Sequence, residues 1–153
     1  MLARQGAKVA LVDFNLEWAE DTKRMIDAEG GVSEVVHADV TDEESCRNAV
    51  AKTVELFGAL HILVNIGEST SSSNLCVPCT ALIGDPAVGV GGAMGDATTV
   101  DLAAWERDFR INLTSMLLMA RHAIPEMRKN GRGAIVNLSS VSGCKTIRTV
   151  SEA

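Results

Sequence analysis

The chain contains no tyrosine and only three phenylalanines and two tryptophans among its 153 residues. It also lacks an excess of positive charge, because 14 lysines and arginines stand against 20 aspartates and glutamates, for a net charge of −6. Proteins that bind nucleic acids present a basic face to the phosphate backbone. The charge balance therefore argues against nucleic acid as a partner.

Long hydrophobic runs are absent as well. No apolar stretch approaches the roughly 20 residues that span a bilayer, so no membrane span is predicted. The short apolar stretch at residues 7–12 ends at an acidic residue, and no small-residue cleavage site follows it. The sequence therefore predicts no signal peptide.

The four cysteines show no spacing of a disulfide framework, which predicts a reducing, cytoplasmic location. Two of them form the motif CVPC at residues 76–79, which has the spacing of a redox pair or of half a zinc site. A second pair is absent, because Cys46 and Cys144 stand alone, and the three histidines show no ligand spacing. We therefore expect ordinary loop cysteines and no metal site.

The residues that are present alternate between buried strands and amphipathic helices. Continuous apolar runs predict strands at residues 7–13, 34–38, 60–65 and 134–138. The stretches between them predict a helix from Asn15 to about Ala28, a helix ended by Gly58, and a long helix from about 101 to 130. Such alternation predicts an α/β fold with a doubly wound parallel sheet and helices on both faces.

Three local features refine this outline. The motif TDEE at residues 41–44 predicts a capping box, in which Thr41 and Glu44 each satisfy a free backbone N–H. Pro125 is expected to kink the long helix or to mark a boundary within it. The Ser- and Gly-rich stretch at about 68–99 has no clear period and predicts a long loop.

The motif GVGGAMG at residues 89–95 has the look of a phosphate-binding loop, but the pattern G-x-G-x-x-G requires a third glycine where Met94 stands. No convincing strand precedes the motif. We expect a flexible loop there.

In a parallel sheet, ligands bind beyond the carboxyl ends of the strands. The strand ends of this chain resemble those of the short-chain dehydrogenase/reductase family. GAKVALVD at 6–13 is similar to the family's second strand, HADVTD at 37–42 to its third strand and the following turn, and ILVNIG at 62–67 to its LVNNAG element. Residues 111–140 resemble its long helix and fifth strand.

The resemblance implies a Rossmann-like domain over residues 1–153 and an oxidoreductase that transfers a hydride between NAD(H) and a small alcohol or carbonyl substrate. Asp13 would accept hydrogen bonds from the adenosine ribose hydroxyls and would repel a 2′-phosphate, which favours NAD over NADP. Asp39 and Val40 would lie beside the adenine. Asn65 and Gly67 would let the backbone approach the cofactor, although the family's second asparagine is missing here.

The resemblance also implies two catalytic residues. Asn112 matches a helix asparagine that holds a water on the proton relay, and Ser140 matches the serine that binds the substrate oxygen. Ser139 would support the loop at this position and the nicotinamide side of the cofactor site. Each has a simpler reading, because serines after a strand are ordinary turn residues and an asparagine in a helix is often bonded locally.

The family's Tyr-x-x-x-Lys pair is missing from these residues, and so is its N-terminal Thr-Gly-x-x-x-Gly-x-Gly turn. The implied sheet is therefore incomplete, without the first strand and the later strands. Because that first strand normally lies at the centre, we expect either two half-sheets that close up or a gap with unpaired strand edges.

We accordingly expect the 153 residues alone to bind dinucleotide weakly or not at all and to be inactive. The activity, with possible homo-oligomers, is expected to belong to a full-length parent. Two alternatives remain: a non-catalytic nucleotide-binding or regulatory module derived from the family, and another nucleotide-binding α/β enzyme such as a methyltransferase.

Overall fold

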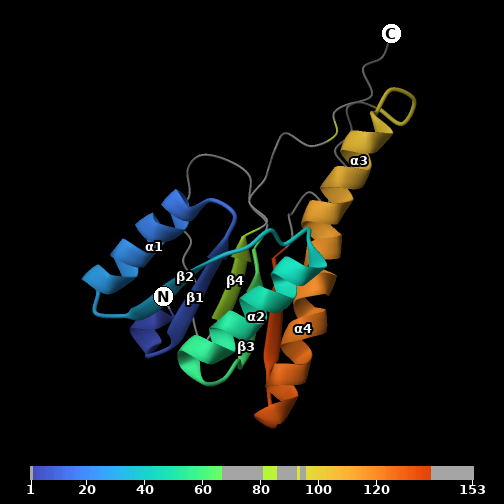
Figure 1. The fold of residues 1–153 in the computed structure, drawn as a ribbon. Helices are drawn as coiled ribbons and strands as arrows, with labels where there is room; N and C mark the ends of the chain where they lie inside the picture. The colour runs from blue at the N-terminus through green and yellow to red at the C-terminus, as the bar shows by residue number, and fades with distance from the viewer. Residues whose placement is uncertain (1, 67–80, 86–92, 94–95, 139–153) are drawn as a thin grey trace.

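A computed structural model describes residues 2–66, 93 and 96–138, and the backbone of residues 81–85 (Figure 1). The elements in chain order are the 3-10 helix η1 (Ala3–Gln5), β1 (Lys8–Asp13), α1 (Leu16–Ala28), β2 (Val32–His37), α2 (Glu43–Phe57), β3 (Ile62–Asn65), β4 (Ala81–Asp85), α3 (Leu102–Phe109), the π-helical turn η2 (Arg110–Thr114), α4 (Ser115–Lys129) and β5 (Ala134–Asn137).

The five strands form one parallel sheet in the order β2-β1-β4-β3-β5. All carboxyl ends therefore lie at one edge, which is the upper edge in Figure 1. The parallel α/β prediction is confirmed. The strand predicted at 34–38 is found as β2, which begins two residues earlier and ends one residue earlier. The other three predicted strands are found as β1, β3 and β5.

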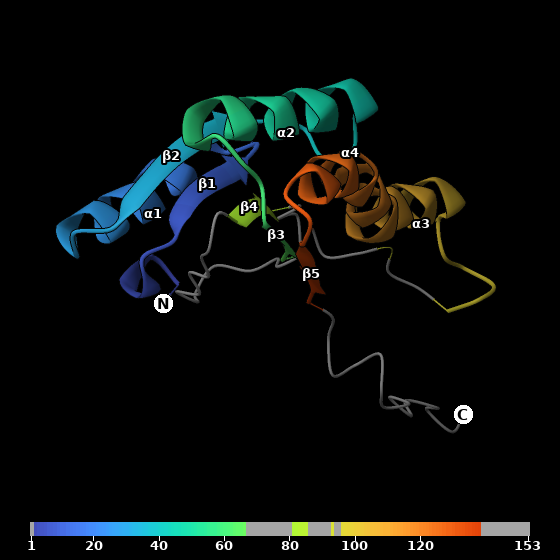
Figure 2. The ribbon, with the colours of Figure 1, turned by 90° about the horizontal axis from the view of Figure 1, so that it is seen from below.

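Helices cover both faces of the sheet. Successive β1 side chains point to opposite sides and so contact different helices. Val9 and Leu11 pack with Ala19 and Ile26 of α1 on one face. On the other face lies the larger cluster, which joins the sheet to α2 and α4: Ala10, Val12, Val36, Leu63, Cys46, Ala49, Val50, Leu118, Met119, Ala123 and Met127. Figure 2 shows α2 and α4 along the same side of the sheet.

The ends of the first two long helices follow from side-chain capping. Asn15 Oδ1 accepts from the backbone N–H groups of Glu17 and Trp18, as predicted. The predicted capping box at Thr41 is wrong, because Asp42 is the N-cap of α2 and its Oδ2 accepts from Ser45 N at 2.7 Å. Thr41 is held instead by Asp39, which removes its hydroxyl from the helix end.

The expectation that the sheet either closes up or is left with a gap is also wrong. β4 lies in the middle and pairs in parallel with β1 on one side and β3 on the other. Its residues fall inside the stretch for which a loop was predicted, so that stretch contributes a strand. The same strand precedes the glycine-rich motif at 89–95, of which the structure describes only Ala93.

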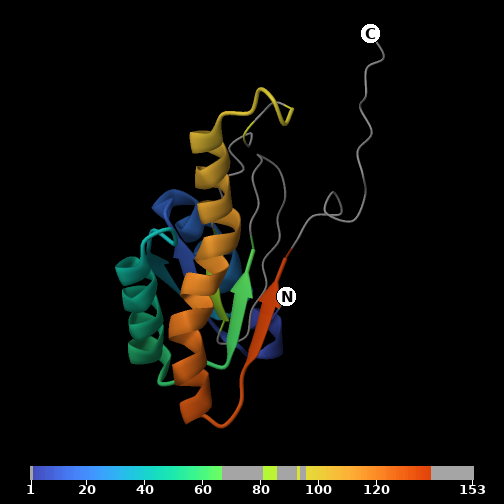
Figure 3. The same ribbon diagram turned by 90° about the vertical axis from the view of Figure 1, so that its right-hand side faces the viewer.

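The long helix is confirmed as one continuous rod made of α3, η2 and α4, which Figure 3 shows beside β3 and β5. Its irregularity lies in the π turn at 110–114, and α4 continues through Pro125 to Lys129 without a boundary there. Four large apolar residues that recur every three or four positions in the first half of this helix are exposed rather than buried. Their exposed fractions are 47–69%: Leu102, Trp105, Phe109 and Leu113.

Candidate functional site

Asp13 lies at the carboxyl tip of β1, where the chain turns into α1. Its side chain is only 9% exposed, and its Oδ1 accepts from Asn15 N at 2.7 Å. Burial raises the pKa of this carboxyl, although hydrogen bonds from the backbone of Asn15 and Phe14 and the nearby His37 oppose the rise. The result is a carboxylate acceptor that is held in one position and is poorly hydrated.

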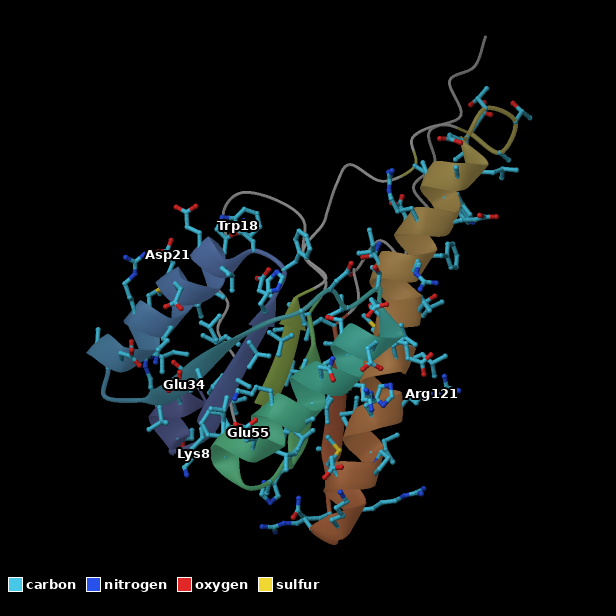
Figure 4. The ribbon with its side chains drawn as sticks, in the orientation of Figure 1. Lys8, Trp18, Asp21, Glu34, Glu55 and Arg121 are labelled. Atoms are coloured by element: carbon cyan, nitrogen blue, oxygen red, sulfur yellow. The ribbon has the colours of Figure 1, made fainter. Side chains whose placement is uncertain are left out.

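The tip of β2 lies directly beside Asp13. Asp13 and His37 are register partners, and Ala38 N donates to the backbone carbonyl of Asp13 at 3.1 Å. The rings of Phe14 and His37 lie 5.5 Å apart at a tilt of 37°. Trp18, in the first turn of α1, is 56% exposed near the same edge (Figure 4).

The turn after β2 is fixed by Asp39. Its Oδ1 accepts from both the backbone N–H of Thr41, at 2.8 Å, and the Thr41 hydroxyl, at 2.7 Å, while its own N–H donates to Ser45 Oγ at 2.9 Å. Val40 is 6% exposed and packs in the core with Cys46, whose Sγ contacts the Val40 carbonyl at 3.3 Å. Asp39 and Val40 were both predicted to lie beside the adenine of the cofactor. The buried Val40 side chain offers little surface for such a contact.

Arg110 connects this turn to the long helix, a link that the sequence analysis missed. Arg110 Nη2 donates to the backbone carbonyl of Thr41 at 2.7 Å. Arg110 is also the first residue of the π turn that carries Asn112. No local sequence pattern signals such a contact, because the partners are 69 residues apart.

Asn112 is exposed, and its side-chain amide donates to the carbonyl of Asp108 at 3.0 Å. The π register around it is held by Ser115, which is 2% exposed. Its backbone N–H donates five residues back to Arg110, and its hydroxyl donates to the carbonyl of Ile111. Single π turns inside α-helices are frequent at functional sites.

Asn65 ends β3 and is 3% exposed. Its Nδ2 donates to Oδ1 of Asn137, its register partner at the end of β5, at 2.8 Å. Asn137 lies inside a predicted strand and was not among the predicted site residues. The available signal was a polar residue near the end of an apolar run.

Gly67, Ser139 and Ser140 lie outside the described residues, and so does the motif CVPC at 76–79. In the described part of the chain, no three His, Cys, Asp or Glu side chains are grouped to hold a metal ion. None of the helices there has the length and apolar character of a membrane span. Of the predicted site residues, the structure describes Asp13, Asp39, Val40, Asn65 and Asn112.

Family models match two parts of the chain. Residues 1–75 match the model described as enoyl-(acyl carrier protein) reductase, and residues 85–152 match the model described as short chain dehydrogenase. The chain is similar to the 2,5-dichloro-2,5-cyclohexadiene-1,4-diol dehydrogenase LinX of Sphingobium indicum, with 35% identity over 92% of this chain and 48% of LinX. It is also similar to the cyclohexanol dehydrogenase of an Acinetobacter species, with 28% identity over 99% of this chain and 52% of that protein.

Solved structures agree with these relatives. A short-chain type dehydrogenase/reductase from Mycobacterium ulcerans superimposes with a TM-score of 0.75 at 26% identity, covering 96% of this chain and 47% of that one. The chain spans about half the length of the curated relatives it matches. With two family models that together match residues 1–75 and 85–152, and with this fold, the chain belongs to the short-chain dehydrogenase/reductase family.

Proposed function

We propose that the carboxyl edge of the sheet binds the adenosine half of NAD. The observation that carries this proposal is the buried, positioned carboxylate of Asp13 at the end of β1, beside the tip of β2. Ribose hydroxyls are hydrogen-bond donors, and a carboxylate is an acceptor, so the two are complementary. The negative charge of the same carboxylate would repel a 2′-phosphate on the ribose, which favours NAD over NADP.

The turn at residues 39–41 fits the adenine side. Both hydrogen bonds from Thr41 reach Oδ1 of Asp39, so Oδ2 is the candidate acceptor for the adenine amino group. Val40 would add a small apolar contact, since little of it is exposed. Asn65 and Gly67 would border the cofactor beyond β3, with Asn65 held by Asn137. Ser139 would lie toward the nicotinamide.

Similar solved structures include one with NAD⁺ and one with NADP. One similar structure is an NAD⁺-bound xylitol dehydrogenase, and another is a metagenomic short-chain oxidoreductase in complex with NADP. The choice between the two nucleotides for this chain therefore depends on its own residues. Asp13 is the residue on which we base the preference for NAD over NADP.

We further propose that the longer protein oxidises a secondary alcohol on a six-membered carbon ring, or reduces the matching ketone. Two relatives are dehydrogenases of cyclohexanol and of a chlorinated cyclohexadienediol. When bound, NAD supplies the hydride acceptor. Ser140 would bind the substrate oxygen, and Asn112 would hold a water on the proton path from its position in the π turn.

Residues 1–153 would then form part of a Rossmann-type domain, with an insertion at about 68–99 that contributes β4. The exposed Leu113 and Leu117, at 59% and 67%, support self-association through the long helix. A cytoplasmic location belongs to the same proposal and is compatible with the free thiol of Cys46.

Nucleotide titration tests the proposal directly. Trp105→Phe leaves Trp18, at the candidate edge, as the only tryptophan, so its fluorescence reports binding there. We expect saturable binding of NAD⁺ that is tighter than that of NADP⁺. In the same background, Asp13→Asn should weaken NAD⁺ binding by about 10- to 100-fold, since hydrogen bonds to charged groups contribute about 1.5–3 kcal/mol.

Glu17→Gln is the matched control, because it removes one negative charge from the first turn of α1 without touching the tip of β1. It should leave binding unchanged. No saturable signal with either nucleotide, or equal affinity in the Asp13→Asn variant, would overturn the proposal.

The alternative is a non-catalytic nucleotide-binding or regulatory module. The absence of tyrosine from the 153 residues favours it for this chain alone, because the family's general acid/base is a tyrosine. An assay of the longer protein with cyclohexanol and NAD⁺, followed at the absorbance of NADH, separates the two. Nucleotide binding without NADH formation by the longer protein supports the module, whereas NADH formation excludes it.

A further inference from the structure

His37 is the last residue of β2 and lies beside Asp13 at the carboxyl edge of the sheet. The two residues are register partners in the parallel pairing of β1 with β2. Neighbouring strands lie about 4.8 Å apart, and paired residues send their side chains to the same face of the sheet. The imidazole of His37 and the carboxylate of Asp13 are therefore neighbours, on the face where Val9 and Leu11 pack against α1.

The two side chains differ in their access to solvent. Asp13 is 9% exposed, whereas His37 is an exposed residue. The ring of His37 contacts the ring of Phe14, which is itself 65% exposed, at a centroid distance of 5.5 Å. Burial raises the pKa of Asp13, and the charge of His37 is among the groups that oppose this rise. The imidazole is thus electrostatically linked to the carboxylate and open to a ligand at this edge.

Other charged groups lie on the elements that pack around this pair. They come from β1, α1, β2 itself, the turn after β2 and the start of α2: Asp13, Glu17, Lys23, Glu34, Asp39 and Glu43. The one cation in this set, Lys23, donates to the backbone carbonyl of Ser33, four residues before His37. The others are acidic, so a neutral His37 leaves the edge negatively charged.

We propose that His37 makes the choice of cofactor depend on pH: its protonated imidazole accepts the 2′-phosphate of NADP beside Asp13, and its neutral imidazole leaves NAD preferred. This inference rests on the proposed binding of the adenosine half at Asp13 and adds a second specificity-determining residue to it. Histidine suits this role because it is the side chain whose charge ordinarily changes between about pH 5 and 8.

The two cofactors respond differently to the charge of His37. When the imidazole is neutral, a 2′-phosphate meets the uncompensated negative charge of Asp13. When it is protonated, the positive charge offsets that repulsion, and a ring N–H can donate a charge-assisted hydrogen bond to a phosphate oxygen. The 2′-hydroxyl of NAD carries no charge, so NAD⁺ binding should change much less between the two states of His37.

The test is a fluorescence titration of the full chain in the Trp105→Phe background, with NADP⁺ and with NAD⁺, at about pH 8 and about pH 5.5. We expect the ratio of the NADP⁺ to the NAD⁺ dissociation constant to fall at the lower pH. A phosphate monoester also gains a proton near pH 6, so the same titration of His37→Gln supplies the baseline. The fall should be about 3- to 10-fold larger with His37 than with glutamine, the effect of one nearby unit charge at a protein surface.

Two further variants in the same background complete the test. His37→Lys carries its charge at both pH values, so it should bind NADP⁺ more tightly than the Trp105→Phe chain at pH 8. His61→Gln is the matched control, because His61 precedes β3 at the opposite edge of the sheet, and it should keep the pH dependence.

The outcomes separate this inference from the proposed function. No saturable binding of either nucleotide overturns both. Saturable binding with an equal fall in the ratio for His37 and for His37→Gln overturns the role of His37 alone. The same conclusion follows if His37→Lys binds NADP⁺ no more tightly than the Trp105→Phe chain at pH 8.

Discussion

The side-chain amide of Asn65 donates to the side-chain oxygen of Asn137 at 2.8 Å, across the ends of β3 and β5. Asn65 is 3% exposed, so its amide depends on this acceptor. Asn137→Ala should lower the free energy of unfolding by about 1–3 kcal/mol, since a buried donor is left without a partner.

Urea denaturation measures this loss, and Asn137→Asp is the matched control because a carboxylate still accepts from Asn65. We expect the control to remain close to the unmodified chain at neutral pH. Equal unfolding free energies for the two variants would show that the hydrogen bond contributes nothing.

Asp13 should couple stability to pH in the direction opposite to most acidic residues. Burial raises its pKa above the ordinary value of 3.8, so the ionised carboxylate costs free energy in the folded state. Asp13→Asn should therefore increase the free energy of unfolding at neutral pH. The gain should shrink as the pH falls through the raised pKa, and should vanish below about 3.8, where the carboxyl is protonated in both states.

Urea denaturation across this pH range checks the prediction, with the exposed Asp21→Asn as control. A variant that is less stable than the unmodified chain at neutral pH would contradict it. Since the same substitution should weaken NAD⁺ binding, stability and binding should change in opposite directions.

Cys46 should be an unreactive thiol in the folded chain. Burial, followed by the negative charges of Asp42, Asp39 and Glu43, raises its pKa from 9.0 to about 11. At equal pH this shift leaves about 100-fold less thiolate, which is the reactive form. Alkylation by iodoacetamide at pH 8, resolved by peptide mass spectrometry, should be at least that much slower in buffer than in urea. Similar rates in the two solvents would argue against a buried Cys46.

Asp42, rather than Thr41, should be the residue whose loss weakens the start of α2. Its carboxylate accepts from Ser45 N at 2.7 Å. Asp42→Ala should lower the free energy of unfolding by about 1 kcal/mol, the typical contribution of an N-cap. The exposed Glu55→Ala, near the end of the same helix, serves as the control in thermal or urea unfolding. A larger effect from the control than from Asp42→Ala would place the cap elsewhere.

The sequence was sufficient for features that depend on local pattern. The run at β1 is apolar on both faces, so it predicted a parallel strand buried on both faces, and Asn15 predicted the start of α1. The error at Thr41 arose because two adjacent residues can cap one helix. The choice depends on Asp39, which holds the Thr41 hydroxyl in the folded turn.

Features that depend on distant contacts could not be predicted in this way. The pairing of Asn65 with Asn137 and the bond from Arg110 to Thr41 join residues about 70 positions apart. β4 is the clearest case, because a short apolar segment among serines and glycines becomes a strand only when two other strands provide ladders for it. The exposed face of the long helix was likewise not separable from its buried face by spacing alone, since both contain large apolar residues.

The position of β4 also has a consequence for how the chain folds. β1 and β2 meet early, since the partners Lys8 and Val32 are 24 residues apart, but Val9 must wait for Ala81, 72 residues later in the chain. Closing so long a loop is slow, and the centre of the sheet is completed only after β1, β2 and β3 have been synthesised. During synthesis the edge of β1 that pairs with β4 therefore stays exposed until residues 81–85 have been made. Nascent chains are expected to associate through that edge, and refolding yield should fall as protein concentration rises.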